Sequence, residues 1–195
     1  MGTVTDITGY PYSGKTLLLK EIIMNGYIKH QTKNCLYLPD DGDTMDIIAN
    51  LVHKLSGKTF DKKYSNNLEE NEVYRYVTQI LNDFVIVSDD NHITPEEFWR
   101  KSIELGCNTA SIDSWNVMAH PDAISTSYLA KTLSLRNRLA QVNNVHFFTV
   151  IHPKNPTSVN YDKSGNLKEP SAFDLMGGSE WNNNGKNILV VHKQE

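Results

Sequence analysis

Gly9-Tyr10-Pro11-Tyr12-Ser13-Gly14-Lys15-Thr16 fits the phosphate-binding pattern G-x-x-x-x-G-K-[ST]. The five residues before it, Val4–Thr8, alternate in hydrophobicity like a strand, and residues 16–25 after it carry apolar side chains at helical spacing. Strand, glycine loop and helix form an anion cradle, because the loop N–H groups and the helix N-terminus point at the same place. The sequence therefore predicts a phosphate-binding loop.

Each residue of this loop has an expected part in binding a nucleotide. Lys15 reaches the β- and γ-phosphates in such loops, and the Thr16 hydroxyl holds Mg²⁺. The predicted nucleotide-binding residues are Gly9, Tyr10, Pro11, Tyr12, Ser13, Gly14, Lys15, Thr16 and Leu17. ATP, or another nucleoside triphosphate, and Mg²⁺ are the expected cofactors.

Length and composition indicate one folded α/β domain over residues 1–195. Hydrophobic residues make up 39% and charged residues 22%, and no apolar run reaches the roughly 20 residues that span a bilayer. Residues 1–9 lack the features of a signal peptide. The two isolated cysteines, Cys35 and Cys107, are expected in the core. A cytoplasmic protein without a membrane partner is expected.

The net charge of −4 argues against a broad basic face that coats duplex DNA. The net charge does not exclude a local channel that binds nucleic acid. Lys154, Lys163 and Lys168 fall in a polar stretch, residues 153–170, that reads as a long loop. A solvated loop is the alternative, but loops of this length are often functional.

Strand and helix patterns alternate along the whole chain, which predicts a mainly parallel, twisted sheet with helices on both faces. Thr94-Pro95-Glu96-Glu97 predicts a helix start with a capping box. The expected strands are 4–8, 35–38, 85–87, 110–113, 145–151 and 188–191, and the expected helices are 16–25, 45–52, 73–84, 95–105 and 125–141.

Ligands of such sheets bind at the carboxyl ends of the strands. Acidic residues lie at or just after the ends of three of the expected strands: Asp40 and Asp41, Asp89 and Asp90, and Asp113. A P-loop nucleotidase needs such an acid for its Mg²⁺ shell. The run before Asp89 is the more hydrophobic, so composition alone favours Asp89 over Asp113.

In order, the motifs resemble the RecA-like ATPase domain of DnaB-type hexameric replicative helicases, which include Twinkle-like members. The glycine loop is similar to that family's Walker A motif, and Ile112-Asp113-Ser114-Trp115-Asn116 resembles its Walker B motif. Four further stretches carry the resemblance: Tyr37-Leu38-Pro39-Asp40, Val150-Ile151-His152-Pro153-Lys154, Asp174–Trp181 and Asn187–Lys193.

The resemblance implies roles for individual residues. Asp113 and Thr16 position Mg²⁺. Asp40 is the catalytic carboxylate that orients the attacking water, and His152 senses the γ-phosphate. Lys193 stands at the position of the ring's arginine finger. In the family the loop that corresponds to residues 153–170 contacts single-stranded DNA, which makes Lys154, Lys163 and Lys168 the expected DNA-binding residues.

Three features depart from the family pattern. Asp40 stands where the family usually has Glu, so its carboxylate sits about one methylene farther from the attacking water. Lys193 replaces Arg, and an ammonium lacks the planar donor fork that matches phosphate oxygens. The family's N-terminal domain and linker helix are also expected to be absent from this chain.

The resemblance implies an ATP-hydrolysing helicase motor that acts on single-stranded DNA and assembles as a hexameric ring in its full-length context. The alternative is a RecA-like recombination or regulatory ATPase that uses ATP as an assembly switch. A small-molecule kinase is disfavoured, because Arg136 and Arg138 fall on an expected helix and not in an arginine-rich lid.

Overall fold

The computed structural model describes residues 2–39, 43–88, 93–121 and 124–193. Its centre is one sheet in the order β3-β2-β4-β5-β1-β6, and every neighbouring pair of strands is parallel. The strands are β1 (Val4–Thr8), β2 (Asn34–Tyr37), β3 (Phe84–Ile86), β4 (Thr109–Ile112), β5 (His146–Ile151) and β6 (Asn187–Val190).

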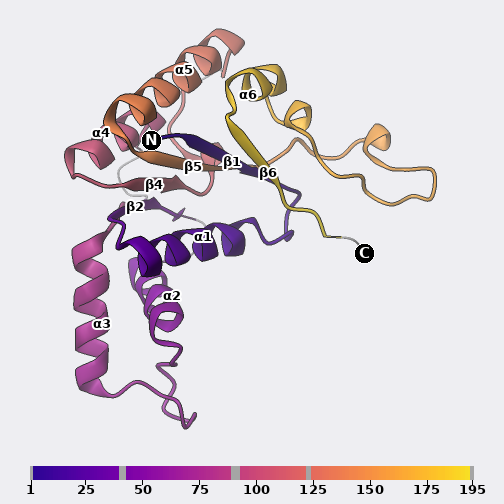
Figure 1. Cartoon of the computed structure of the whole chain (residues 1–195). Helices are drawn as coiled ribbons and strands as arrows, with labels where there is room; N and C mark the ends of the chain where they lie inside the picture. The colour runs from indigo at the N-terminus through magenta and orange to yellow at the C-terminus, as the bar shows by residue number, and fades with distance from the viewer. Residues whose placement is uncertain (1, 40–42, 89–92, 122–123, 194–195) are drawn as a thin grey trace.

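Helices cover both faces of this sheet (Figure 1). One face carries α1 (Lys15–His30), α2 (Thr44–Ser56) and α3 (Glu70–Asp83), and the other carries α4 (Pro95–Glu104), α5 (Thr126–Asn143) and α6 (Gly178–Asn184). The predicted α/β class with a parallel sheet is confirmed. None of the helices in the described ranges is long and apolar enough to cross a membrane.

The core between the sheet and α4, α5 and α6 gathers the chain's three tryptophans. Trp99 stacks on Trp115 with ring centroids 6.1 Å apart, and Trp115 meets Trp181 edge to face at 5.2 Å. Cys35 and Cys107 are buried free cysteines of this same core, as predicted.

A buried ion pair ties α5 to the strand that precedes the glycine loop. Arg136 Nη1 and Nη2 donate to the two Asp6 carboxylate oxygens at 2.5 and 3.0 Å, and Nη1 also donates to Thr149 Oγ1. The Arg136 guanidinium lies 5.5 Å from the Trp181 ring, within range of a cation–π contact. This residue therefore links β1, β5, α5 and α6.

Helix boundaries follow the sequence signals closely where a cap is present. Thr94 Oγ1 accepts from the Glu97 backbone N–H and the Glu97 side chain accepts from the Thr94 N–H, which confirms the predicted capping box of α4. Leu81 fits the apolar spacing of the expected helix 73–84, but it is 56% exposed on α3. Only one stripe of α3 packs against α2, and Ile80 occupies it.

Residues 153–174, which we call the arm, leave the end of β5 and stand out from the body before the chain returns to α6 (Figure 1). A bridge between Pro153 and Leu175 closes its base, and a second between Tyr161 and Leu167 lies farther out. The predicted loop is thus a folded projection. The short helix α6 that follows it was not predicted.

Candidate nucleotide-binding site

The glycine loop connects β1 to α1 at the carboxyl end of the sheet. A Cβ on Gly9 would lie 2.2 Å from the Val191 carbonyl oxygen, so only glycine allows this close approach to the chain beyond β6. Gly14 has a φ of 96° and caps α1, a conformation that an L side chain rarely adopts. Both glycines of the motif are thus required by the backbone.

Lys15 is the first residue of α1 and is 5% exposed. Its ammonium nitrogen donates to the Tyr10 carbonyl at 3.0 Å, which turns the side chain back over the loop. Burial lowers the pKa of Lys15, and the charge of Asp113 acts in the opposite sense. The fold therefore holds the buried Lys15 side chain against a carbonyl of the glycine loop.

Thr16 and Asp113 meet although 97 positions separate them in the sequence. Thr16 Oγ1 donates to Asp113 Oδ2 at 2.6 Å, and Asp113 is only 5% exposed. Asp113 follows β4, where its backbone N–H donates to the Tyr37 carbonyl at the end of β2, and the Asp113–Ser114 peptide is cis. A hydroxyl and a carboxylate thus converge beside the glycine loop.

These groups fit a magnesium-bound nucleotide. The Ser13 and Ser114 hydroxyl oxygens are buried and have no hydrogen-bond partner among the described residues. Mg²⁺ favours oxygen ligands and takes one or two carboxylates plus phosphates and water, which suits Thr16 and Asp113. Within the described part of the chain, no group of three or more His, Cys, Asp or Glu residues could hold a metal by itself.

His152 is the first residue after β5, and its backbone N–H donates to Asn116 Oδ1 at 3.0 Å. Asn116 lies three positions after Asp113 in a short 3₁₀ turn (Trp115–Val117). Asn116 belongs to the stretch that resembles a Walker B motif, and the sequence predicted no role for it. This hydrogen bond connects the Asp113 segment to the start of the arm.

The remaining predicted site residues divide into two groups. Asp40, Asp41, Asp89 and Asp90 lie outside the described residues. Lys193 is exposed beyond β6, two positions after Val191, whose N–H donates to the Thr8 carbonyl at 2.8 Å. The end of the described chain is therefore anchored next to the start of the glycine loop.

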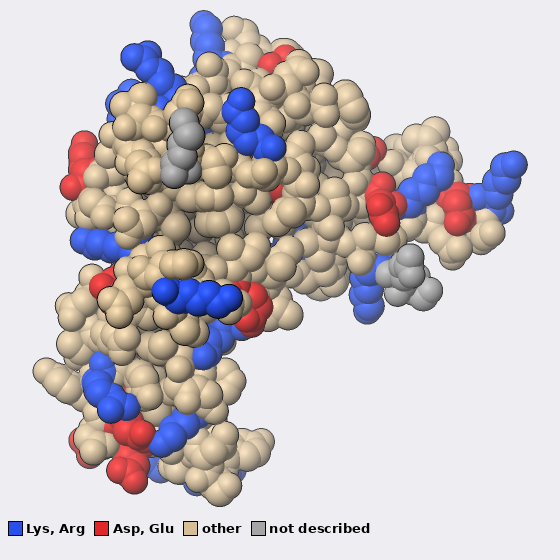
Figure 2. Space-filling view, viewed as in Figure 1, with Lys and Arg blue, Asp and Glu red and all other residues tan. Residues whose placement is uncertain are grey.

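The three predicted DNA-binding lysines, Lys154, Lys163 and Lys168, are all exposed on the arm. Lys168 Nζ donates to the Val159 carbonyl at 2.9 Å, so it also helps to fold the arm. Figure 2 shows Lys and Arg interspersed with Asp and Glu, on the arm as on the rest of this face. This view shows no broad basic surface.

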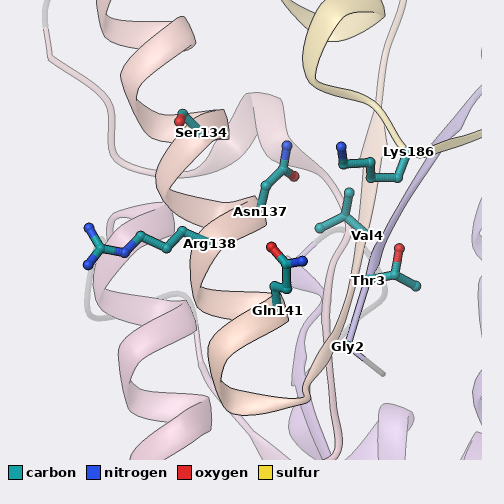
Figure 3. A pocket seen from close by; sticks show the side chains of 8 residues that line it. All are labelled: Gly2, Thr3, Val4, Ser134, Asn137, Arg138, Gln141 and Lys186. Atoms are coloured by element: carbon teal, nitrogen blue, oxygen red, sulfur yellow. The ribbon is translucent and has the colours of Figure 1, made fainter.

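A cavity of about 500 Å³ lies between α5 and the amino end of β1, at the opposite end of the sheet from the glycine loop. Asn137 and Lys186 point toward each other across it, whereas the Arg138 guanidinium is turned away (Figure 3). None of the predicted site residues lines this cavity.

Comparison with known proteins supports the fold by shape and not by sequence. No family model matches the chain, and no curated protein matches it. A solved structure of an ATPase domain matches with a TM-score of 0.70 and 14% identity over 95% of this chain and 68% of that one. A structure of a DnaB-like replicative helicase, described with its interactions with primase, matches with a TM-score of 0.70 and 16% identity over 95% of this chain.

The fold is similar to the folds of this ATPase domain and of the DnaB-like helicase. This confirms the predicted RecA-like architecture, in which the glycine loop after β1 and the carboxylate after β4 come together. The chain spans about half, 47%, of the DnaB-like helicase structure. At 14 and 16% identity the two matches show the shared fold alone.

Proposed function

We propose that this chain is a nucleoside-triphosphate-hydrolysing motor domain of the DnaB type that acts on single-stranded DNA. The observation that carries the proposal is the 2.6 Å hydrogen bond between Thr16 and Asp113 beside a glycine loop with a buried Lys15. The similarity of fold to an ATPase domain and to a DnaB-like helicase supports the same class of activity. Residues 1–195 are proposed to form the single RecA-like domain of that motor.

Charge stabilisation is the main task of such a site, because phosphoryl transfer needs little covalent chemistry from the protein. Lys15 and the loop N–H groups stabilise the phosphate oxygens. Thr16 and Asp113 hold Mg²⁺, directly or through water, and when bound the ion neutralises charge that develops on the phosphates. Asp40 orients the attacking water.

The nucleotide is proposed to lie between neighbouring copies in a hexameric ring. His152 reports the γ-phosphate to the arm, where Lys154, Lys163 and Lys168 contact successive phosphates of single-stranded DNA. Lys193 supplies the cation to the neighbour's γ-phosphate. A RecA-like assembly switch is the second candidate, and two sequence features favour it: the shorter carboxylate of Asp40 and the lysine at position 193.

The test compares nucleotide binding and turnover in wild type, Lys15→Ala and Asp113→Asn. Both variants are expected to lose Mg²⁺-dependent turnover, and Lys15→Ala is expected to lose Mg·ATP binding while circular dichroism stays unchanged. Lys29→Ala, an exposed lysine near the end of the same helix, is the matched control. Wild-type affinity and turnover in Lys15→Ala would reject the nucleotide site.

DNA-stimulated hydrolysis with displacement of a paired strand supports the motor. ATP-dependent assembly on DNA without displacement supports the switch instead. Asp89→Asn is expected to retain turnover, and a severe loss there with normal turnover in Asp113→Asn would transfer the Mg²⁺ role to Asp89.

A further inference from the structure

The two central strands β4 and β5 end at different heights on the side of the glycine loop. They pair in parallel, with Thr109 beside His146 and Ile112 beside Thr149. β4 ends at Ile112, whereas β5 continues to Ile151. The backbone groups at the end of β5 that face β4 therefore extend past the last residue of that strand.

The His152 N–H is the next of these groups. His146, six positions earlier, donates its N–H to the Asn108 carbonyl at 2.9 Å. Hydrogen bonds between parallel strands are evenly spaced and recur at every second residue, so a continued ladder would give His152 the Ser114 carbonyl. The His152 N–H instead donates to Asn116 Oδ1 at 3.0 Å. The Asn116 side chain thus replaces a main-chain acceptor and extends the ladder past the end of β4.

The turn that carries Asn116 is held in place by its neighbours. The Val117 N–H donates to the Ser114 carbonyl at 3.3 Å, so this carbonyl is already used within the turn. Trp115 is 3% exposed, and its carbonyl accepts from His120 Nε2 at 2.8 Å. The Asn116 side chain is exposed, but its backbone lies next to an anchored residue.

The hydrogen bond of Asn116 joins two segments that have proposed roles. Asp113 lies three positions before Asn116 and accepts from Thr16 Oγ1 at 2.6 Å. His152 is the last residue before the arm. One hydrogen bond therefore holds the backbone of the proposed γ-phosphate sensor beside the segment of the proposed Mg²⁺ carboxylate.

We propose that Asn116 is a positioning residue for nucleotide turnover, which acts through the His152 backbone. This inference rests on the proposed function. Catalysis of phosphoryl transfer depends on the placement of groups around the phosphate, and a misplacement of about 1 Å can cost roughly 10²-fold in rate. The glycine loop and Lys15 bind the nucleotide without this bond. Its loss should therefore slow turnover and leave affinity unchanged.

Three measurements on the full chain test the inference. They are the affinity for a non-hydrolysable ATP analogue with Mg²⁺, the turnover per subunit at high protein concentration with single-stranded DNA, and the hydrogen exchange of the His152 amide by NMR. Asn116→Ala is expected to bind the analogue as the wild type does. Its turnover should fall roughly 10- to 100-fold, the usual effect of removing a group that orients a functional residue. Its His152 amide should exchange faster.

Two further variants separate positioning from a general loss of structure. Asn116→Asp keeps an acceptor oxygen at the same place on the side chain and is expected to restore both turnover and slow exchange. Asn71→Ala, at an exposed asparagine of α3, is the matched control and should behave as the wild type does. A merely structural defect would lower affinity and turnover together, and Asn116→Asp would have no particular reason to correct it.

Wild-type turnover in Asn116→Ala would overturn the inference, and so would an unchanged exchange rate of its His152 amide. Equal losses of affinity and turnover in Asn116→Ala, or an Asn116→Asp variant as slow as Asn116→Ala, would also overturn it. Failure of the wild type itself to bind the analogue or to hydrolyse ATP would reject the proposed function, and the inference with it. The wild-type measurements therefore distinguish the two failures.

Discussion

At the scale of single residues, the pairs that define the molecule are those that meet across long sequence separations. Thr16 and Asp113 form such a pair, and their meeting was expected only through the resemblance of residues 112–116 to a Walker B motif, since composition alone favoured Asp89. Arg136 and Asp6 form another, but both residues are charged members of patterns that read as an ordinary helix and strand. No local signal distinguishes a fully buried arginine from a solvated one, so this pair required the structure.

Removal of one partner of the buried Arg136–Asp6 pair is expected to lower the stability of the fold severely. Arg136→Met leaves the Asp6 carboxylate buried without its guanidinium, which should cost about 3–5 kcal/mol of unfolding free energy. The double variant Asp6→Leu/Arg136→Met removes both charges and is expected to recover much of that loss. Urea denaturation of the wild type and of both variants measures this. A double variant as unstable as Arg136→Met would show that the cost lies in packing and not in the unpaired charge.

A half-buried histidine, His120, should make stability depend on pH. Burial lowers the pKa of His120 below its ordinary value of 6.5, while Nδ1 and Nε2 lie 3.1 Å from the Tyr128 hydroxyl oxygen and 2.8 Å from the Trp115 carbonyl oxygen. The unfolded chain then binds the proton more readily than the folded chain. The contribution of the neutral His120 to the free energy of unfolding is therefore fully present above pH 6.5. This contribution is lost as the pH drops from 6.5 toward the lowered pKa of His120 in the folded chain.

The His120→Gln variant tests that dependence, since glutamine does not titrate. Its unfolding free energy should fall less between pH 7 and pH 5 than that of the wild type, by up to about 1.4 kcal/mol for each unit by which the pKa is lowered. His30→Gln, at an exposed histidine at the end of α1, serves as the control. Identical pH profiles for wild type and His120→Gln would contradict the prediction.

At the scale of elements, prediction succeeded where a local signal sets the structure. The capping box of α4 and the β-branched runs of β1 and β5 are such signals, because capping and burial act over a few residues. Leu81 and α6 show the limit. Leu81 fits the helical period of α3, but whether a partner covers that side of a helix depends on its tertiary neighbours. α6 is only seven residues long, Gly178–Asn184, and carries three consecutive asparagines of low helix propensity.

The α4 cap offers a direct test at this scale. Thr94→Ala removes the hydroxyl that both accepts from the Glu97 N–H and donates to the Glu97 carboxylate, and should cost about 1 kcal/mol of stability. Thr94→Ser keeps a hydroxyl and is expected to stay near the wild type. Thermal unfolding of the three proteins measures the difference. Equal stability of Thr94→Ala and wild type would mean that tertiary packing alone holds this helix.

At the scale of the whole molecule, the fold places the candidate phosphate site at one end of the sheet, beside the arm. The sequence motifs predicted Thr16 and Asp113 as members of this site, and the structure brings these two residues together. The motifs did not reveal how the site connects to the arm, because the hydrogen bond of Asn116 with the His152 N–H joins two segments that have no periodic pattern of their own. The proposed shared site between copies is a further step, and it rests on the fold and on Lys193.

Turnover per subunit, measured across a wide range of protein concentration with and without single-stranded DNA, tests the central claim most directly. If Lys193 of one copy completes the site of the next, the dilute chain should be a poor ATPase. Specific activity should then rise with concentration and rise again when DNA gathers copies on one strand, because such a cation is worth roughly 10³–10⁵ in rate in related nucleotidases. A constant, high specific activity from a protein that sedimentation shows to be monomeric would contradict the shared-site account.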